Sequence, residues 1–287
     1  MTRRGKRQRL QALAAEVARS KDLRYARALE VLLVLISESS PLRKVPRCEP
    51  TQQLFLDGIR FTIEMVELSF TRLCTQLWQF SDTKVQRQRR QHHAYAYGAA
   101  LLDAWSVVDS IERLRTLILK MRGLKRTRPI KEFLANSSNV RPFRNRLHHL
   151  NEDLANGLYI GKPVLGCISW VTYVDTHTPT RRIFVLTPGA LTHEVANLVN
   201  PVGVTTRAPL DLVTLFAHGA EVSLTNQMQY VASIVQPLET AITDALGHLP
   251  PAGGDMLFSC DCTNRDEEPV DPQYVAFIDG LRNQQMV

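Results

Sequence analysis

Two long stretches of the sequence carry large apolar residues at the three-to-four-residue spacing of an amphipathic helix. The first runs from about Gln53 to Phe80, and the second runs from about His92 to Met121. Helices of this length joined by a short connection pack antiparallel to each other. The sequence therefore predicts a helical bundle built around this pair.

Shorter helical patterns lie on both sides of the pair. Pro41, Pro46 and Pro50 predict a loop before it, and a short helix is expected over Ile130–Ala135 after it. A further helix of roughly four turns is expected over residues 141–157, with Pro142 in its first turn and Asn156-Gly157 at its end. Two N-terminal helices are indicated by the apolar residues Leu10, Leu13, Ala14 and Val17, and then Leu29, Leu32, Leu33 and Ile36.

The pattern changes after Gly161. Two segments rich in β-branched and aromatic residues, 164–174 and 181–189, flank the turn sequence DTHTPT and predict a β-hairpin. The segment EVSLT, 221–225, is a further candidate strand. A helix is expected over Asn226–Leu246, with Asn226 as its N-cap and a kink or break at Pro237.

The expected fold is therefore mainly α, an antiparallel helical bundle with a small C-terminal α/β accessory region that contains the hairpin. We divide the chain into a basic N-terminal helical region at 1–50, the bundle at 51–160, the accessory hairpin and helix at 161–250, and an acidic tail at 251–287. The tail is expected to be poorly ordered unless it docks on the rest of the protein.

Charge is divided very unevenly along the chain. Residues 1–150 hold 29 Lys and Arg against 13 Asp and Glu, a net charge of +16, whereas residues 151–287 hold 6 against 15, a net charge of −9. The basic residues cluster at 3–9, 84–93 and 120–131. Such clusters neutralise phosphates without reading a base sequence, so the first half of the chain predicts RNA binding. The residues expected to contact RNA are Arg87, Arg89, Arg90, Lys125, Arg126, Arg128, Arg141 and Arg146.

Several classes of protein lack support in the sequence. The longest apolar run, VLLVLI at 31–36, is far shorter than the roughly 20 residues that a spanning helix needs, and no secretory signal is recognisable. Five scattered cysteines predict reduced thiols, and only Cys260 and Cys262 form a close pair. No Gly-rich phosphate loop, zinc-protease motif or serine-hydrolase motif is present. We expect a cytoplasmic protein with no membrane contact, no metal and no cofactor.

The segment RPFRNRLHHLNEDL, residues 141–154, combines charge and chemistry on one expected helix. A helical wheel places Phe143, Leu147, Leu150 and Leu154 in one stripe, which is expected to be core. Arginine near a helix N-terminus is disfavoured by the helix dipole, so Arg144 implies a negative partner nearby, and Glu152 and Asp153 are candidates. Acidic residues on the preceding long helix, namely Asp103, Asp109 and Glu112, are expected to be surface charges. Trp78, Trp105 and Trp170 are expected to be core or interface residues.

This set of residues fits cleavage of RNA without a metal. The reaction needs a base for the ribose 2′-hydroxyl, an acid for the leaving 5′-oxygen and fixed positive charge on the phosphate. Histidine suits the acid and base roles because its ordinary pKa is about 6.5, and arginine binds phosphate oxygens in a bidentate manner. One helix carries only part of the set, which makes a homodimer with two helices facing one groove attractive.

The spacing Arg144-Asn145-x-x-x-His149 resembles the R-x(4–6)-H motif of the HEPN superfamily, and the bundle at 53–157 resembles its fold. The helix is also similar to one in a wider group of HEPN-like bacterial proteins. This resemblance implies a dimeric, metal-independent endoribonuclease, a hydrolase that leaves 2′,3′-cyclic phosphate and 5′-hydroxyl ends. It also implies a place in toxin–antitoxin or phage (antiviral) defence systems, with an antitoxin or defence protein as partner. Arg144 would bind the phosphate, Asn145 would position it, and His149 would be the general acid or base.

Alternatives stay open at this stage. His148 lies four residues from Arg144 and could act in place of His149. The same helix could instead be part of a non-catalytic dimerisation and nucleic-acid-binding module. A third hypothesis is that the acidic C-terminal half, notably RDEEPVD at 265–271, docks on the basic bundle and restrains it.

Overall fold

A computed structural model describes residues 35–81, 93–157, 161–173, 181–189, 198–202, 204, 210–217 and 219–256. The chain divides into two compact units, residues 1–253 and 254–287, and the fold below is that of the first. Several predictions fall outside the described residues. These are the N-terminal helices up to residue 34, the contacts of Arg87, Arg89 and Arg90, the Cys260/Cys262 pair, and the docking of the tail segment 265–271.

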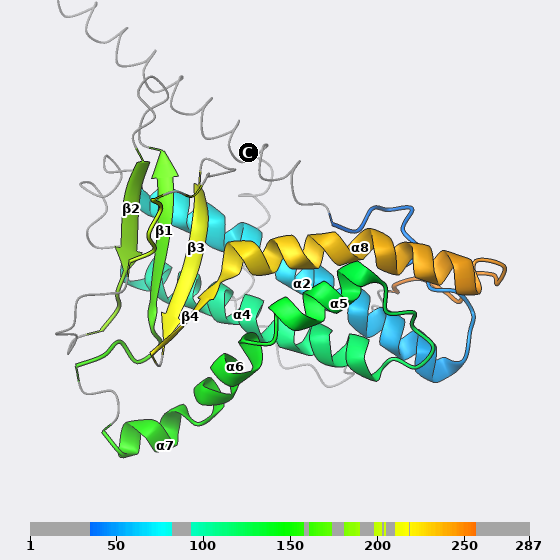
Figure 1. The fold of residues 1–287 in the computed structure, drawn as a ribbon, viewed down its shortest axis with the longest axis horizontal. Helices are drawn as coiled ribbons and strands as arrows, with labels where there is room; N and C mark the ends of the chain where they lie inside the picture. Colours follow the sequence, from blue (N-terminus) through cyan, green and yellow to red (C-terminus); the bar gives the residue numbers. More distant parts are fainter. Residues whose placement is uncertain are drawn as a thin grey trace, which may run out of the picture. The chain divides into compact units, whose positions relative to one another are not determined.

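Helices α2 (Pro50–Ser81) and α4 (His93–Lys120) form the antiparallel pair that the sequence predicts (Figure 1). Their packed faces are apolar and fully buried, as Ile63 and Leu73 on α2 and Ile111 and Leu114 on α4 illustrate. The outer face of α2 still exposes large apolar residues, among them Leu54 and Leu68. Helix α4 is buried around most of its circumference from residue 100 to residue 118, as expected of a helix surrounded by other elements.

Three short helices follow α4. They are α5 (Arg128–Asn136), α6 (Val140–His148) and α7 (Leu150–Ala155). The single four-turn helix expected after residue 140 is therefore wrong, because the chain breaks at His149, which ends α6 and begins α7 with φ −93° and ψ 9°. Pro142 does lie in the first turn of α6.

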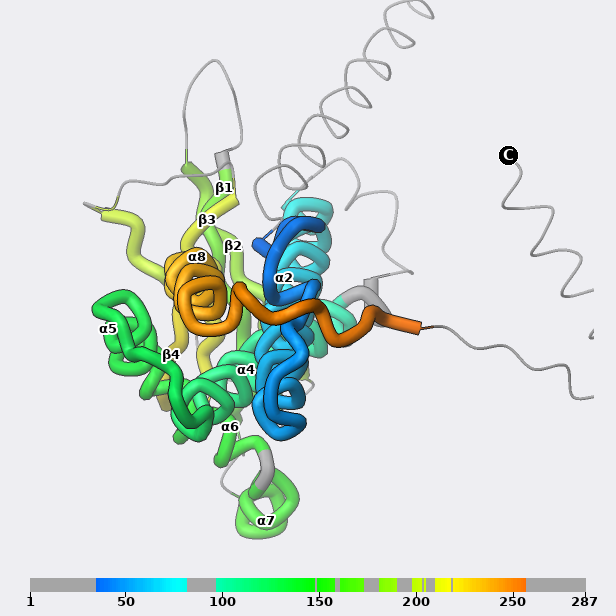
Figure 2. The backbone as a smooth tube through the Cα atoms, turned by 90° about the vertical axis from the view of Figure 1, so that its right-hand side faces the viewer, coloured from blue at the N-terminus to red at the C-terminus, as the bar shows by residue number. Residues whose placement is uncertain are grey.

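The apolar stripe expected along this segment is also only partly buried. Phe143 is 2% exposed and stacks on Trp105 with ring centroids 5.1 Å apart. Leu147 and Leu150 are half-buried, and Leu154 is 41% exposed. None of the residues of α7 is buried, and Figures 1 and 2 both show α7 lying away from the other helices. The prediction is confirmed for Phe143 and wrong for Leu150 and Leu154, because α7 lies away from the helices that bury α6 (Figure 1) and buries none of its residues.

The second half of this unit contributes a four-stranded antiparallel sheet in the order β2-β1-β3-β4. The strands are β1 (Cys167–Tyr173), β2 (Arg181–Leu186), β3 (Leu210–Ala217) and β4 (Ala220–Ser223). The predicted hairpin is confirmed as β1 and β2, and the segment EVSLT begins in β4. Strand β3 was not predicted, because it is buried on both faces and so lacks the polar–apolar alternation of a half-exposed strand.

Helix α8 (Leu224–Leu246) continues directly from β4. Its N-cap is Ser223, whose hydroxyl accepts a hydrogen bond from the Asn226 amide, so the prediction of Asn226 as the cap is wrong. The helix runs through Pro237 without the predicted break. Figures 1 and 2 show α8 alongside α2 and α5.

Helices and sheet share one hydrophobic core. Ile168, Trp170 and Val213 of the sheet belong to the same buried cluster as residues of α2, α4 and α8. The Trp170 indole donates to the Ser81 hydroxyl at the end of α2, over 2.9 Å. Trp105 and Trp170 are buried and Trp78 packs against the core, as predicted. The chain thus combines helices with an antiparallel sheet.

Gly166 fixes how β1 approaches β3. Its φ is +82°, and a Cβ atom there would lie 2.2 Å from the Phe216 carbonyl oxygen. We expect Gly166→Ala to lower the free energy of unfolding by about 2–4 kcal/mol, because it combines a left-handed backbone with a clash against backbone. Gly219 is the matched control, since its φ is +73° but its Cβ would meet nothing within 4 Å. Chemical denaturation should show a clearly smaller loss for Gly219→Ala, and equal losses would contradict this account.

Candidate nucleic-acid interface

Three carboxylates of the central helix α4 face its neighbours. Asp103 and Glu112 are 2% and 6% exposed, and the side chain of Asp109 is 34% exposed. The prediction that all three are surface charges is therefore wrong for Asp103 and Glu112. Carboxylates in such positions need ionic or hydrogen-bonding partners, and each of the three has at least one arginine within 4.0 Å.

Asp109 is held by two arginines. The Arg144 Nε donates to its Oδ1 over 2.5 Å, and the Arg113 Nη2 donates to its Oδ2 over 2.9 Å. Burial raises the pKa of the Asp109 carboxyl, but the hydrogen bonds and charges of Arg144 and Arg113 outweigh it and hold that pKa below its ordinary value. Arg144 does have the negative partner that its position implies, but the partner is on α4, not at Glu152 or Asp153.

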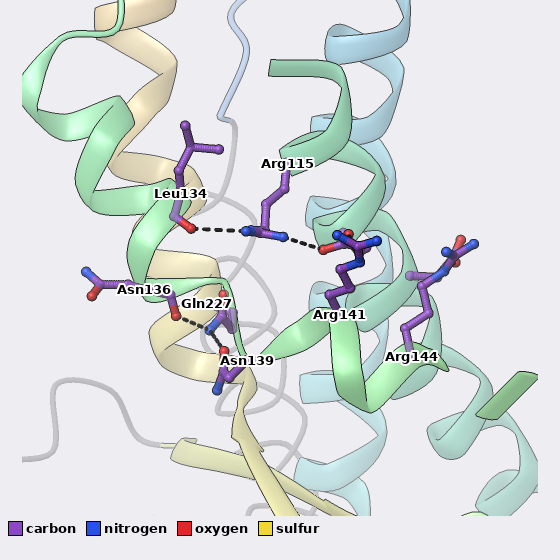
Figure 3. Close-up of polar contacts among 9 residues, drawn as sticks. Arg115, Leu134, Asn136, Asn139, Arg141, Arg144 and Gln227 are labelled. Atoms are coloured by element: carbon purple, nitrogen blue, oxygen red, sulfur yellow. Dashed lines mark hydrogen bonds and ion pairs between the residues drawn. The ribbon is translucent and has the colours of Figure 1, made fainter. Parts of the chain in front are cut away.

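Glu112 also faces two arginines, at different distances. The Arg115 Nη1 donates to its Oε2 over 2.6 Å, whereas the Arg141 Nε lies 4.0 Å from its Oε1, which is too long for a hydrogen bond. The side chain of Arg115 is 11% exposed and that of Arg141 is 70% exposed. Figure 3 shows Arg141 and Arg144 side by side, both reaching from α6 towards α4.

Hydrogen bonds from α4 and α8 fix the connection between α5 and α6. Arg115 also donates to the Leu134 carbonyl over 3.3 Å. Gln227 of α8 donates through Nε2 to the Asn136 carbonyl over 3.2 Å and to the Asn139 Oδ1 over 3.4 Å (Figure 3). Contacts from α4 and α8 therefore set the position from which α6 begins.

The remaining predicted catalytic residues are more exposed. Asn145 is exposed on α6, and His149 is 64% exposed, with its Nδ1 3.3 Å from Glu152 Oε2. The side chain of His148 lies outside the described residues. In the part of the chain that the structure describes, no hydrogen bond or ion pair joins Arg144 to His149, because each side chain contacts a different carboxylate.

Basic residues predominate from the end of α4 to α6. Between Lys120 and Arg146 the chain holds nine Lys and Arg against one acidic residue, Glu132. Most of these cations are exposed, namely Lys120, Arg122, Lys125, Arg126, Arg128, Lys131, Arg141 and Arg146. We call residues 120–146 the basic segment. Arg126 donates to the Leu119 carbonyl, and Arg128 pairs with Glu132 over 2.7 Å.

In the part of the chain that the structure describes, no group of three His, Cys, Asp or Glu side chains is placed to hold a metal ion. No described helix is long and apolar enough to cross a membrane. Cys48, Cys74 and Cys167 are free thiols, and burial raises the pKa of the Cys74 thiol well above its ordinary value.

Comparison with known proteins found no match to this chain among family models, curated proteins or solved structures.

The Arg144–Asp109 pair is expected to anchor α6 to α4. A double-mutant cycle with Arg144→Gln and Asp109→Asn should give a coupling energy of about 1 kcal/mol in chemical denaturation, since the pair is half-buried and short. The control cycle uses Arg128 and Glu132, a pair of similar length whose side chains are 91% and 56% exposed. That cycle should show no measurable coupling. Equal coupling in the two cycles would contradict an anchoring role for Arg144.

Asp103 is expected to reduce stability at neutral pH. Burial raises the pKa of its carboxyl even though Arg72 and Gln76 act against the shift. A carboxyl whose pKa is higher in the folded state makes stability fall as the pH rises from the unfolded pKa through the folded pKa. Asp103→Asn should therefore raise the free energy of unfolding at pH 7, and the gain should shrink as the pH is lowered towards about 4.

Asp109→Asn is the matched control for this test, because the pKa of Asp109 is shifted downwards. A lowered pKa contributes stability above the unfolded pKa that is lost in acid. Denaturation curves at pH 7 should thus show opposite effects for the two substitutions, and a destabilised Asp103→Asn variant would refute the assignment.

Proposed function

We propose that this protein binds RNA through the basic segment, residues 120–146. The observation that carries the proposal is the nine-to-one excess of cationic over acidic residues there, with eight of the nine cations exposed. Contacts to phosphate supply most of the sequence-independent affinity of proteins for nucleic acids. The resemblance of the Arg144–His149 helix to HEPN proteins favours RNA as the ligand.

Binding has better support than catalysis within one copy of the chain. A metal-independent ribonuclease needs its acid, base and phosphate-binding groups around one scissile bond. Here Arg144 donates to Asp109 on α4, whereas His149 stands beyond the end of α6 next to Glu152. The two side chains that the resemblance assigns to catalysis thus have separate partners.

RNA cleavage is the second candidate function, and the exposure of His149 favours it. An imidazole that is 64% exposed beside a carboxylate can exchange protons with a substrate. A homodimer that brought α6 and α7 of two copies together would place two such imidazoles near two copies of Asn145 and Arg146. We propose this HEPN-like endoribonuclease arrangement only in that dimeric form, where an antitoxin or defence partner could regulate it.

RNA binding is tested by neutralising the middle of the basic segment. The triple variant Lys125→Gln, Arg126→Gln, Arg128→Gln should bind a fluorescent single-stranded RNA of 20 nucleotides at least tenfold more weakly. The slope of log K against log salt should fall by about 2, as loss of three phosphate contacts implies. The control removes three exposed cations elsewhere, with Lys44→Gln, Lys162→Gln and Arg182→Gln. Equal effects of the two triple variants would leave only a general charge effect and would reject the assigned surface.

Cleavage is tested separately with His149→Ala, which removes an exposed side chain and should leave the thermal midpoint unchanged. Purified protein is incubated with total RNA in the presence of a chelator, and the new ends are mapped. If the second candidate is right, the parent protein leaves 2′,3′-cyclic phosphate ends and His149→Ala loses at least about 100-fold in rate. His148→Ala tests the neighbouring histidine in the same assay. If the RNA stays intact with the parent protein at concentrations that saturate binding, the endoribonuclease hypothesis is rejected.

A further inference from the structure

We propose that Arg141 binds a phosphate group of the RNA at the surface of α6, and that Arg144 is a positioning residue which holds α6 in place for it. The inference rests on the proposed RNA binding and assigns its central contact. It differs from the role that the HEPN resemblance implies, in which Arg144 itself binds the phosphate.

Arginines outnumber carboxylates between α4 and α6. Four guanidinium groups, those of Arg113, Arg115, Arg141 and Arg144, surround only two carboxylates, Asp109 and Glu112. Two positive charges are therefore in excess in this cluster. An anion from outside the protein can offset them.

The four arginines contact the two carboxylates unequally. Asp109 accepts hydrogen bonds from Arg113 and Arg144 on separate oxygens, and Glu112 accepts one from Arg115. Arg141 is the member of the cluster that has an ion-pair distance of 4.0 Å and no hydrogen bond among those the structure describes. With 70% of its side chain exposed, its guanidinium can offer donors to a ligand without breaking an internal bond.

Arg141 extends from a helix whose position is fixed. Helix α6 is fixed by the Arg144–Asp109 pair and by Phe143, which is buried against Trp105. Arg141 and Arg144 are three residues apart, so they lie on the same side of α6, as Figure 3 shows. A guanidinium on a fixed helix loses less freedom on binding than one on a loop, and its fork matches two oxygens of a phosphate.

Glu112 leaves the donors of Arg141 available to a ligand. Its carboxylate is already compensated by Arg115 and lies 4.0 Å from the Arg141 Nε, so it takes up none of the Arg141 donors. A phosphodiester carries one negative charge on two free oxygens, which suits the two-pronged donor geometry of a single exposed guanidinium. The exposed Arg146 on the same helix can contact the next phosphate along the strand.

The test measures binding of the 20-nucleotide fluorescent RNA by single variants of the full chain. Arg141→Gln should weaken binding about tenfold and leave the thermal midpoint unchanged, whereas Arg141→Lys should recover only part of the loss, because lysine keeps the charge but lacks the fork. Lys162→Gln, an exposed cation outside the basic segment, is the control and should change affinity less than twofold.

The role of Arg144 is separated from a merely structural one by a double variant. Arg144→Gln should lower the thermal midpoint and weaken binding, but in the Arg141→Gln background it should cause no further loss of affinity. An additive loss would mean that Arg144 contacts the RNA itself, and this would overturn the division of roles.

The remaining outcomes distinguish the inference from the proposed function. If the Lys125/Arg126/Arg128 triple variant weakens binding and Arg141→Gln does not, RNA binding stands and the phosphate contact at Arg141 is refuted. If neither changes affinity, the proposed function itself fails. Full recovery by Arg141→Lys would likewise refute a bidentate contact, since plain charge would then explain the effect.

Discussion

The burial of α4 is the constraint on which the rest of the structure depends. A helix enclosed by α2, α6 and α8 would ordinarily be apolar on every side, yet it carries three carboxylates. Each carboxylate requires a cation: Arg72 of α2 supplies one for Asp103 and Arg144 of α6 supplies one for Asp109, whereas Glu112 pairs with Arg115 of α4 itself. The position of α6 thus depends on charge placed on the central helix, together with the stacking of Phe143 on Trp105 and the hydrogen bonds from Gln227 of α8.

Because the buried carboxylates need cations, the arginines near them have two different roles. Arg144 connects α6 to α4 through Asp109, and Arg115 connects α4 to α5 through the Leu134 carbonyl, whereas Arg141 faces solvent. The sequence alone does not make this distinction, because Arg141 and Arg144 are the same residue type on the same short helix. Only the positions of Asp109 and Glu112 separate them.

The sequence predicted the long helix pair because its apolar periodicity is regular over many residues, and it predicted the hairpin because two segments rich in β-branched and aromatic residues flank a turn sequence. It also predicted α5 and α8. It missed β3, where Asp211 is buried and Leu212 adopts a φ of 53° in a strand that is covered on both faces. It also extended one helix through His149, because a helical wheel assumes a buried face along its whole length and α7 buries none of its residues. For the site, the need of Arg144 for an anion was predictable, but its partner, 35 residues earlier, was not.

The shared core has a consequence for how the chain reaches this fold. The Ser40 hydroxyl donates to Glu239, 199 residues later, and Trp170 reaches back to Ser81 across 89 residues. Contacts this distant in sequence can close only after most of the polypeptide has been synthesised, since loop closure precedes their formation. During translation the apolar faces of α2 and α4 that pack on α8 therefore lack this cover until the ribosome has passed residue 246, and a nascent chain halted earlier leaves those faces exposed.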